Sequence, residues 1–514
     1  MMTIEQRIGR MFLVGFEGLS APDYILEWLA EGRIGGVILF ARNIGTPEQT
    51  AAMIESCHTA AKHPILVSID QEGGTVARMR EGYSESPGAM ALSAAGNGAV
   101  LSEKMSRVLA DEMRALGINW VYAPVVDITY NRDNPTVGTR SYGSDAERIA
   151  EMAGAAVRGF QAGGVAACAK HFPGLGNTAI DTHLALAVLD DPVEKLLTRD
   201  LIPYQELIRS GIMSIMTTHT VYKALDPELP ATLSPVLVKR LLREKLGFAG
   251  VVTSDCMEMK AIADNWGPGE SAVLAALAGL DVILVSHTRS MQEKAYEALM
   301  AAVKSGRVSE SIIGEANARI ERLHAQLAQA EKPPVSVIRS EAHQQIALEA
   351  ARAGVVTLRS ATEILPVKPD QRVGLIEFAS ILDSEVMERG EIAGFARHLH
   401  AAAPWIEHIA LRSVGEKQEK KERAAALAES ADTLIIATRN AHLIPEQAAA
   451  AKAYLHKAKR TVLICLRNPW DATELPEAQV ALCTCGDSAP SLQAGAEALL
   501  GLFTPTGHLP LAVL

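Results

Sequence analysis

The residues best able to do chemistry stand in one stretch, from Lys170 to His183. The apolar run 165–169 ends just before it, so Lys170 and His171 are expected at the C-terminal tip of a β-strand. The loop that follows contains a proline, glycines and an asparagine, which neither helices nor strands favour. It closes on Asp181 and His183, and an aspartate two residues before a histidine can hold the imidazole and tune its proton affinity. Taken alone, this Asp-x-His pair is explained equally well as a structural loop with a surface histidine.

Outside this stretch, Asp255 is the strongest candidate for a reactive carboxylate. It ends the apolar run 251–255 in the segment Val-Val-Thr-Ser-Asp-Cys-Met-Glu-Met-Lys. A carboxylate at the tip of a strand can present one oxygen to a cavity. The alternative is that Asp255 caps the N-terminus of the helix that follows.

Three further segments contain groups that could bind a hydroxylated ligand. Asp70 and Arg78 lie in Asp-Gln-Glu-Gly-Gly-Thr-Val-Ala-Arg, for which a Gly-Gly turn with a buried ion pair is the alternative. Arg140 lies in Asn-Pro-Thr-Val-Gly-Thr-Arg-Ser-Tyr-Gly. Met216 and His219 belong to one apolar run and are expected to line the pocket, although a packed methionine and a capping histidine explain them equally well.

Together these motifs resemble glycoside hydrolase family 3, in its β-N-acetylglucosaminidase branch. That branch has the pattern Lys-His-Phe-Pro-Gly, a short spacer and then Asp-Ser/Thr-His, which residues 170–183 match. The segment from Asp70 resembles the family pattern Asp-Gln-Glu-Gly-Gly-Arg-Val-x-Arg, and the segment around Arg140 resembles Asn-Pro-x-x-Gly-x-Arg-Ser-Phe-Gly. Two positions depart from these patterns: Leu175 stands where the branch usually has His or Asp, and Thr75 replaces the first arginine.

The resemblance implies a role for each motif. Asp255, placed as the family's nucleophile is, would attack the anomeric carbon and form a covalent glycosyl-enzyme, so that the second displacement gives retention. His183 would be the acid/base and Asp181 would hold its ring, since an Asp-paired imidazole titrates near neutrality. The remaining motif residues would bind the sugar, and these are Asp70, Arg78, Arg140, Lys170 and His171.

The implied activity is that of a retaining exo-β-N-acetylglucosaminidase that removes non-reducing terminal β-GlcNAc, as from peptidoglycan-derived muropeptides. Neither a metal nor an organic cofactor is implied. A β-N-acetylglucosaminide phosphorylase is the main alternative, because a histidine acid/base, unlike a carboxylate, does not repel an incoming phosphate. A non-catalytic sugar-binding barrel is less consistent with an intact nucleophile position, and a β-glucosidase is less consistent with the Asp-x-His loop.

These residues need a scaffold that brings distant parts of the chain together, and the first two-thirds of the chain predicts one. Short apolar runs alternate with helical stretches, and the runs are nearly continuous, as parallel strands buried on both faces should be. The eight predicted strands are 11–16, 36–40, 65–70, 120–127, 165–171, 213–219, 251–255 and 282–286. Eight β-then-α units in roughly 300 residues predict a (β/α)₈ TIM-type barrel over residues 1–330.

Polar side chains gather at the C-terminal ends of these predicted strands. They are Asp70, Asp127, Lys170, His171, His219, Asp255, Ser286 and His287. Any one of them could simply cap a strand or the next helix. Because active sites of such barrels lie at that rim, their shared position predicts a single site.

The last third of the chain predicts a second, smaller α/β domain. Residues 331–340 begin with Glu-Lys-Pro-Pro and are predicted to be a linker. Residues 341–514 start with a helix and continue with β-like runs, several of them separated by helices, which predicts an open three-layer sandwich. The segment 503–510 resembles the end of the second domain in two-domain family 3 enzymes.

Composition limits the possible partners and location. Of 514 residues 48% are hydrophobic but only 4% aromatic, so the core must be mostly aliphatic. The net charge of -11 argues against a nucleic-acid partner. The six cysteines lack the paired motifs of a zinc site and are expected to be free thiols.

No signal peptide and no apolar run of ~20 residues is found, so we expect a cytoplasmic protein with a small saccharide substrate and no membrane partner. The oligomeric state stays open.

Overall fold

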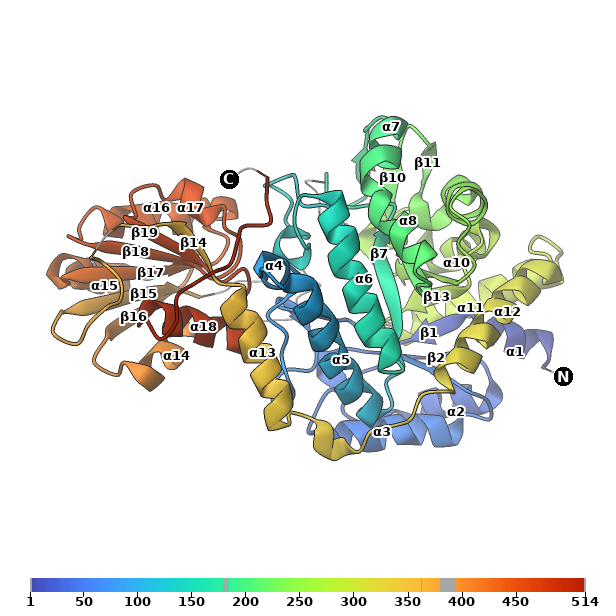
Figure 1. Ribbon diagram of the computed structural model, residues 1–514. Helices are drawn as coiled ribbons and strands as arrows, with labels where there is room; N and C mark the ends of the chain where they lie inside the picture. Colours follow the sequence, from blue (N-terminus) through green and yellow to red (C-terminus); the bar gives the residue numbers. More distant parts are fainter. Residues whose placement is uncertain (1, 179–180, 182–183, 362, 380–393, 513–514) are drawn as a thin grey trace.

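The structure of this chain is a computed structural model that describes residues 2–178, 181, 184–361, 363–379 and 394–512. Figure 1 shows a barrel surrounded by helices, followed along the chain by a sheet packed between helices. The predicted fold class, a (β/α)₈ barrel followed by a smaller α/β domain, is confirmed.

Eight parallel strands close the barrel in the order β1-β13-β12-β9-β7-β6-β3-β2. They are β1 (Phe12–Val14), β2 (Gly36–Leu39), β3 (Leu66–Ile69), β6 (Trp120–Val121), β7 (Ala166–Phe172), β9 (Ser214–Thr217), β12 (Val251–Cys256) and β13 (Val282–Val285). Each strand starts within one residue of its predicted start. β6 is much shorter than predicted, because Pro124 has no N–H to give to the ladder, and pairing resumes only as a bridge between Val125 and Lys170.

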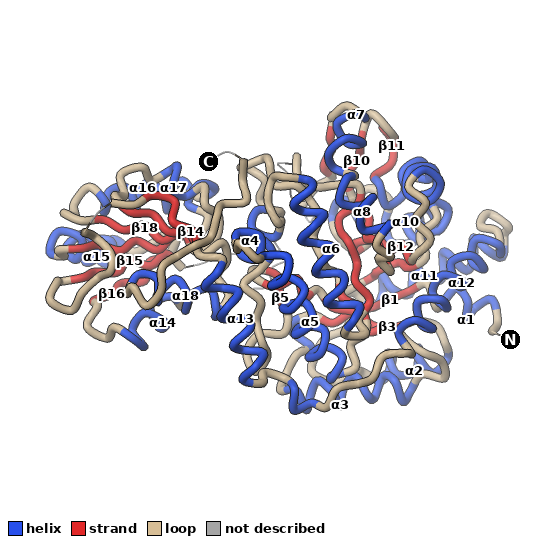
Figure 2. Tube along the Cα trace, in the orientation of Figure 1, coloured by secondary structure: helices blue, strands red, loops and turns tan. Residues whose placement is uncertain are grey.

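Helices cover the outside of the barrel, as the tube in Figure 2 shows. They are α1 (Ile4–Gly9), α2 (Asp23–Glu31), α3 (Pro47–Ala60), α4 (Ala89–Ala94), α5 (Gly98–Leu116), α6 (Ala146–Ala162), α7 (Val193–Lys195), α8 (Ile202–Arg209), the π-helix Val236–Lys245, α9 (Lys260–Ala263), α10 (Gly267–Ala278), α11 (Arg289–Lys304) and α12 (Glu310–Leu327). Local sequence sets their ends. The Thr46 side chain accepts the Gln49 N–H at the start of α3, and α5 ends at Gly117, whose φ of 104° suits glycine.

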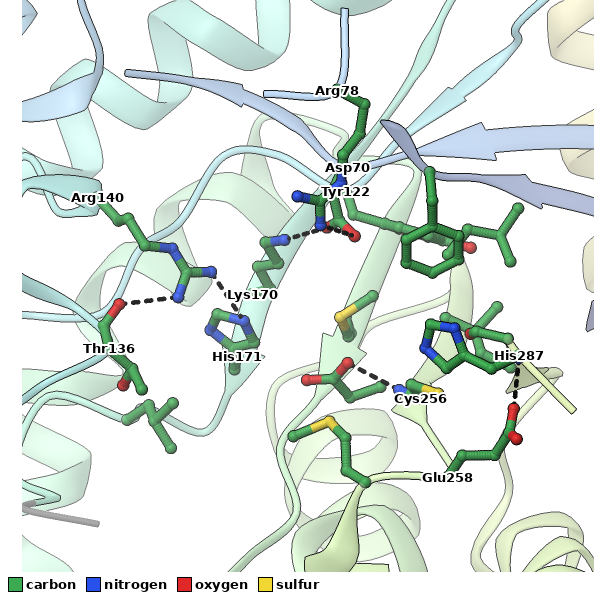
Figure 3. A pocket seen from close by; sticks show the side chains of 18 of the residues that line it. Asp70, Arg78, Tyr122, Thr136, Arg140, Lys170, His171, Cys256, Glu258 and His287 are labelled. Atoms are coloured by element: carbon green, nitrogen blue, oxygen red, sulfur yellow. Dashed lines mark hydrogen bonds and ion pairs between the residues drawn. The ribbon is translucent and has the colours of Figure 1, made fainter. Parts of the chain in front are cut away.

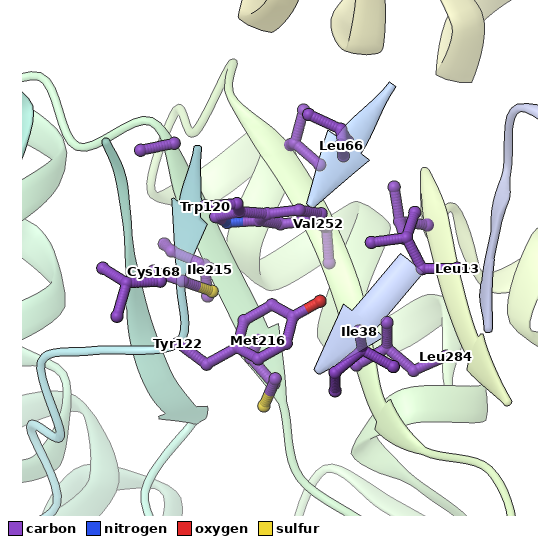
Figure 4. Packing of buried hydrophobic residues seen from close by; sticks show 14 of the residues in the cluster. Leu13, Ile38, Leu66, Trp120, Tyr122, Cys168, Ile215, Met216, Val252 and Leu284 are labelled. Carbon is purple, nitrogen blue, oxygen red and sulfur yellow. The ribbon is translucent and has the colours of Figure 1, made fainter. Parts of the chain in front are cut away.

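The barrel interior is filled by side chains, not by a channel (Figure 4). Most are aliphatic, as the low aromatic content requires. The two aromatic residues Trp120 and Tyr122 are fully buried and keep their polar atoms paired: the Trp120 indole donates to Ser214 at 2.7 Å, and the Tyr122 hydroxyl donates to Ser68 at 2.9 Å. Buried aromatics of this kind need such partners, and here the barrel strands supply them.

Two small sheets at the barrel rim were not predicted from the sequence. One is a hairpin directly after β3, made of β4 (Gln71–Gly73) and β5 (Val76–Ala77). The other contains β8 (Ala187–Leu189), β10 (Thr220–Tyr222) and β11 (Asp226–Pro230). Each strand is too short for its own residue pattern to distinguish it from a loop.

The second domain is a six-stranded sheet of order β14-β19-β18-β17-β15-β16 between two helical layers. Its strands are β14 (Val356–Arg359), β15 (Val373–Phe378), β16 (Glu407–Leu411), β17 (Thr433–Thr438), β18 (Thr461–Cys465) and β19 (Val480–Cys483), all parallel except β14. The helices α15 (Gln418–Ser430), α16 (Pro445–Leu455) and α17 (Asp471–Glu474) cover one face, and α13 (Glu341–Ala353), α14 (Phe395–Ala402) and α18 (Ala489–Leu499) cover the other.

The connection between the two parts is docked on the barrel. After α12 the chain makes a 3₁₀ turn at Val335–Val337 before α13 begins. The carboxylate of Glu112, on α5, accepts the Arg339 N–H at 2.9 Å and lies 2.9 Å from Nδ1 of His343. The predicted boundaries at residues 330 and 341 stay a prediction. Of the described helices, none is long and apolar enough to cross a membrane.

The packing of Trp120 generates a stability prediction. Replacing Trp120 with alanine should lower the free energy of unfolding of the barrel by roughly 3–5 kcal/mol, because it leaves a cavity at the centre and removes the hydrogen bond from the indole to the Ser214 hydroxyl. Urea unfolding followed by circular dichroism measures this. The control Leu502→Ala, at a side chain that is 64% exposed, should change little. Equal unfolding midpoints for both variants would contradict the packing argument.

Candidate active site

A cavity of about 240 Å³ opens at the C-terminal ends of the barrel strands. It is smaller than the roughly 300 Å³ at which pockets for drug-sized ligands begin, so it suits a single sugar ring. Its walls include the predicted residues Asp70, Arg78, Arg140, Lys170, His171, Met216 and Asp255. Figure 3 shows that charged side chains from different strands point toward one another across it. The barrel therefore brings together predicted residues as far apart in the sequence as Asp70 and Asp255, which are separated by 185 positions.

One side of the cavity is a buried network of opposite charges. The Lys170 ammonium lies 2.6 Å from Asp70 and 2.6 Å from Glu72. The Arg140 guanidinium donates two hydrogen bonds to Glu72, at 2.8 and 2.7 Å. Arg78 completes the network with a 3.4 Å contact to Asp70. Asp70 is the most exposed of these side chains, at 14%.

This network fixes the charge state of its members. Burial favours the neutral form of Asp70, but the nearby charges of Lys170 and Arg78 outweigh it and hold the pKa of Asp70 well below its usual range. For Glu72 the same contest between burial and the cations Arg140 and Lys170 lowers the pKa to about 2. Burial opposes the charge of Lys170, yet Asp70 and Glu72 raise its pKa. All of these groups are therefore charged at neutral pH.

His171 is oriented by a second buried carboxylate. Its Nδ1 lies 2.7 Å from Oδ2 of Asp127, while Oδ1 of Asp127 accepts the Leu175 N–H at 2.7 Å. A carboxylate only accepts, so Nδ1 carries a hydrogen and Nε2 is turned toward Arg140, 3.5 Å away. Asp127 thus holds both the ring and the start of the loop that follows β7.

Asp255 reaches the cavity because β12 is irregular at this position. Thr253 pairs with Val282 and Cys256 pairs with Leu284, so three steps along β12 oppose two along β13. The Ser254 hydroxyl accepts the Leu284 N–H at 2.9 Å, and the Cys256 N–H donates to Asp255 at 2.7 Å. Bulges of this kind re-aim side chains next to active sites. Here the bulge places the Asp255 carboxylate in the cavity wall.

Met216 on β9 and His219 just after it were both predicted to line the pocket, but only one of them does. Met216 lines the cavity, as expected. His219 is not among the cavity's lining residues: its ring is fully buried, Nδ1 lies 2.9 Å from the Thr232 hydroxyl and Nε2 lies 2.9 Å from the Cys256 carbonyl. The sequence interpretation of His219 as a pocket residue is thus corrected. Both of its nitrogens are engaged by the protein, and it supports the segment that carries Asp255.

The predicted acid/base pair is described only in part. His183 lies outside the described residues. Asp181 is buried, at 6% exposure, and its carbonyl accepts the N–H groups of Leu184 and Ala185. The described residues that line the cavity do not include Asp181.

The cavity wall also contains Phe40 and Glu258, which the sequence analysis did not single out, and His287, which it named only as a polar residue at the end of a strand. The Glu258 carboxylate accepts the His287 and Thr288 N–H groups, at 2.5 and 2.9 Å. The Phe40 ring lies 4.8 Å from the His287 ring, and the Arg42 guanidinium stands over Phe40 at 4.4 Å. An aromatic face with cations beside it is a surface on which a sugar or its aglycone can lie.

Comparison with known proteins identifies the family. Residues 3–323 match the sequence model described as the glycosyl hydrolase family 3 N terminal domain. The chain belongs to glycosyl hydrolase family 3. A beta-hexosaminidase from Stenotrophomonas maltophilia (strain R551-3) is 38% identical over 289 residues, which are 55% of this chain and 85% of that relative.

Two longer matches place this family 3 chain in the β-N-acetylglucosaminidase branch. Beta-hexosaminidase A from Pseudoalteromonas piscicida is 27% identical over 96% of this chain and 92% of that protein. The solved structure of a family 3 beta-N-acetylglucosaminidase from Paenibacillus sp. str. FPU-7 is 34% identical, covers 99% of both chains and superposes with a TM-score of 0.94. The branch predicted from the motifs is thereby confirmed.

Glu72 and Asp127 support the site of this family 3 enzyme, although the sequence analysis did not single out Glu72 and named Asp127 only as one of the polar side chains at the barrel rim. Glu72 stands two residues after Asp70 in the motif already quoted, and Asp127 ends a predicted strand, so both signals were present. What sequence spacing does not reveal is that Glu72 faces Arg140 and Lys170. Within the described part of the chain, no group of three or more His, Cys, Asp and Glu side chains could hold a metal ion.

The pKa of Glu72 generates a pH prediction. The folded-state pKa of about 2 lies below the ordinary value of 4.5, so ionised Glu72 stabilises the fold above pH 4.5, and this contribution is lost as pH falls from 4.5 toward 2. Glu72→Gln lacks it. The variant should melt at a lower temperature than the wild type near pH 7, and its melting temperature should fall less between about pH 5 and about pH 3.

A surface carboxylate provides the control for this experiment. Glu103→Gln breaks an exposed pair with Arg158 and should leave both the melting temperature and its pH dependence nearly unchanged. If the curves for the wild type and Glu72→Gln run parallel over this pH range, the charge network does not have the role assigned to it.

Proposed function

We propose that this protein is a retaining exo-acting β-N-acetylglucosaminidase that removes terminal β-GlcNAc residues. The observation that carries the proposal is the position of Asp255, at the tip of a barrel strand in the wall of a sugar-sized cavity whose opposite wall holds fixed charges. Membership of this branch supports a β-N-acetylglucosaminide as the substrate, since the Paenibacillus relative is named a beta-N-acetylglucosaminidase.

In the proposed mechanism Asp255 attacks the anomeric carbon as the glycosidic bond breaks. His183, with its ring held by Asp181, gives its proton to the departing oxygen, so the aglycone leaves as a neutral alcohol. The covalent glycosyl-enzyme is then opened by a water from which His183 takes a proton. Two inversions at one carbon leave the β-configuration unchanged.

The charge network has a separate task, which is to hold the sugar. Asp70 can accept hydrogen bonds from sugar hydroxyls, Arg78, Arg140 and Lys170 can donate them, and Nε2 of His171 can accept one. Because these groups are already fixed by one another, they lose little freedom when the sugar binds, and their dipoles are in place as charge develops at the anomeric carbon. Met216 and Phe40 offer apolar contact to the ring.

We further propose that the substrates are wall-derived muropeptides, in which GlcNAc is linked to N-acetylmuramic acid, and that the protein acts in the cytoplasm on imported fragments. The size of the cavity supports this in one respect: because it fits a single sugar, the rest of a muropeptide would extend outside it.

The nucleophile assignment has a direct test. Asp255→Ala should lower kcat for an aryl β-GlcNAc substrate on the order of 10³-fold or more, because the variant lacks the carboxylate proposed to form the covalent bond. A 2-fluoro trapping sugar followed by peptide mapping should label Asp255. Asp264→Ala, at an exposed carboxylate after α9, is the matched control and should keep full activity. Label on another residue, or unchanged turnover by Asp255→Ala, would show the assignment wrong.

The acceptor can be tested separately, since phosphate could replace water in the second step. A histidine acid/base does not repel a phosphate dianion as a carboxylate would. For a hydrolase we expect free GlcNAc at a rate that does not change between phosphate and a non-phosphate buffer. Accumulation of GlcNAc-1-phosphate in phosphate buffer would instead identify a phosphorylase, with the same nucleophile and the same retention.

A further inference from the structure

The position of Arg140 depends on a long loop that the barrel alone does not hold. This Arg140 loop, residues 130–144, lies between β6 and α6. Arg140 donates to the carbonyl of Thr136 at 2.9 Å, and the amide of Asn134 donates to the Leu175 carbonyl at 3.0 Å. The loop therefore carries Arg140 on one side and touches the segment after His171 on the other.

The outer face of the same loop is contacted by the second domain. The side-chain amide of Asn468 packs on Gly138, where a Cβ would lie 3.0 Å from both its nitrogen and its oxygen. Gly138 has a φ of 42° and stands two residues before Arg140. Near the start of the loop, Arg132 forms an ion pair with Glu474 of α17.

Asn468 is itself held in place for this contact. It is 4% exposed and its amide nitrogen donates to Oδ1 of Asn440 at 2.7 Å. Asn440 and Asn468 follow the carboxyl ends of the neighbouring strands β17 and β18. The carboxyl edge of the second sheet is thus the part of that domain that meets the loop.

The C-terminal segment Gly507–Ala512 holds the other end of the loop. In Figure 1 the chain crosses from the second sheet back toward the barrel before it ends. The Pro510 carbonyl accepts the Ser144 N–H at 3.0 Å, and the Ala512 N–H donates to the Ser144 hydroxyl at 2.7 Å. A Cβ on Gly143 would lie 2.1 Å from the Pro510 carbonyl oxygen, so glycine is required for this approach.

None of these second-domain residues lines the cavity. Every described residue that lines the cavity lies between Ile38 and His287. The Stenotrophomonas relative, 85% of which is matched by 289 residues of this chain, has no room for a second domain of this length. The domain is therefore not a requirement of the barrel fold, and its contacts here fall on the segment that carries Arg140.

We propose that the second domain positions Arg140: Asn468 and the segment Gly507–Ala512 hold the Arg140 loop in its sugar-binding conformation, so they set activity without touching the substrate. Asn468 is a positioning residue in this scheme. Its effect must pass through Arg140, which bonds Glu72 and so joins the charge network that holds Lys170. The kinetic part of the test rests on the proposed glycosidase activity, whereas the exchange part does not.

The first measurement is hydrogen exchange of peptides within residues 130–144. Asn468→Ala and deletion of residues 509–514 should each raise the exchange rate there by roughly fivefold or more, because the loop opens more often. The control Glu429→Gln removes an exposed pair with Lys457 elsewhere on the second domain and should leave these peptides unchanged. Unchanged exchange in Asn468→Ala would overturn the proposal, even if the protein hydrolysed no aryl glycoside.

The second measurement is a double-mutant cycle on the hydrolysis of an aryl β-GlcNAc. Asn468→Ala should lower kcat/KM by about tenfold in the wild-type background, but by less than about twofold when Arg140 is already alanine. Glu429→Gln should have no effect in either background. If the losses from Asn468→Ala and Arg140→Ala simply multiply, Asn468 acts on general stability and the positioning role is wrong.

Discussion

The active site depends on charges that are kept out of water only because they neutralise one another. Lys170 lies between Asp70 and Glu72, and Glu72 in turn holds Arg140 through two bonds. An isolated charge at such a depth would be very costly, whereas a fully paired network is tolerated and rigid. This rigidity suits sugar recognition, because donors and acceptors that are already fixed can be aimed at hydroxyl groups without further ordering.

The barrel makes this network possible by ending parallel strands at one rim. Asp70 follows β3, Lys170 belongs to β7 and Asp255 belongs to β12, so three distant segments supply one cavity. Regular strands alone would still not place the Asp255 carboxylate in the cavity. The bulge before Cys256 turns Asp255 into the cavity, and His219 fills the space behind it by bonding the Cys256 carbonyl. The reactive wall is therefore a local departure from the barrel's regular ladder, stabilised by side chains that the substrate does not reach.

The second domain extends this support outward. Its sheet has its own two cores, one on each face, yet its carboxyl edge and the segment Gly507–Ala512 lie against the Arg140 loop. A long loop has few buried apolar contacts and opens easily unless something packs on it. In this protein a neighbouring domain supplies that packing, in addition to the bond between Asn134 and the Leu175 carbonyl.

The sequence by itself determined the strand starts of the barrel, the three-layer second domain and several residues of the cavity wall, because apolar runs and motifs are local patterns. Local patterns did not place His219, which is buried behind Asp255, or explain why Glu72 and Asp127 matter. They also did not show that the segment Gly507–Ala512 returns to Gly143. Each of these depends on which side chains meet across the fold, and only the tertiary structure decides that, since the hydrogen bonds and ion pairs that hold them join residues 37 to 100 positions apart.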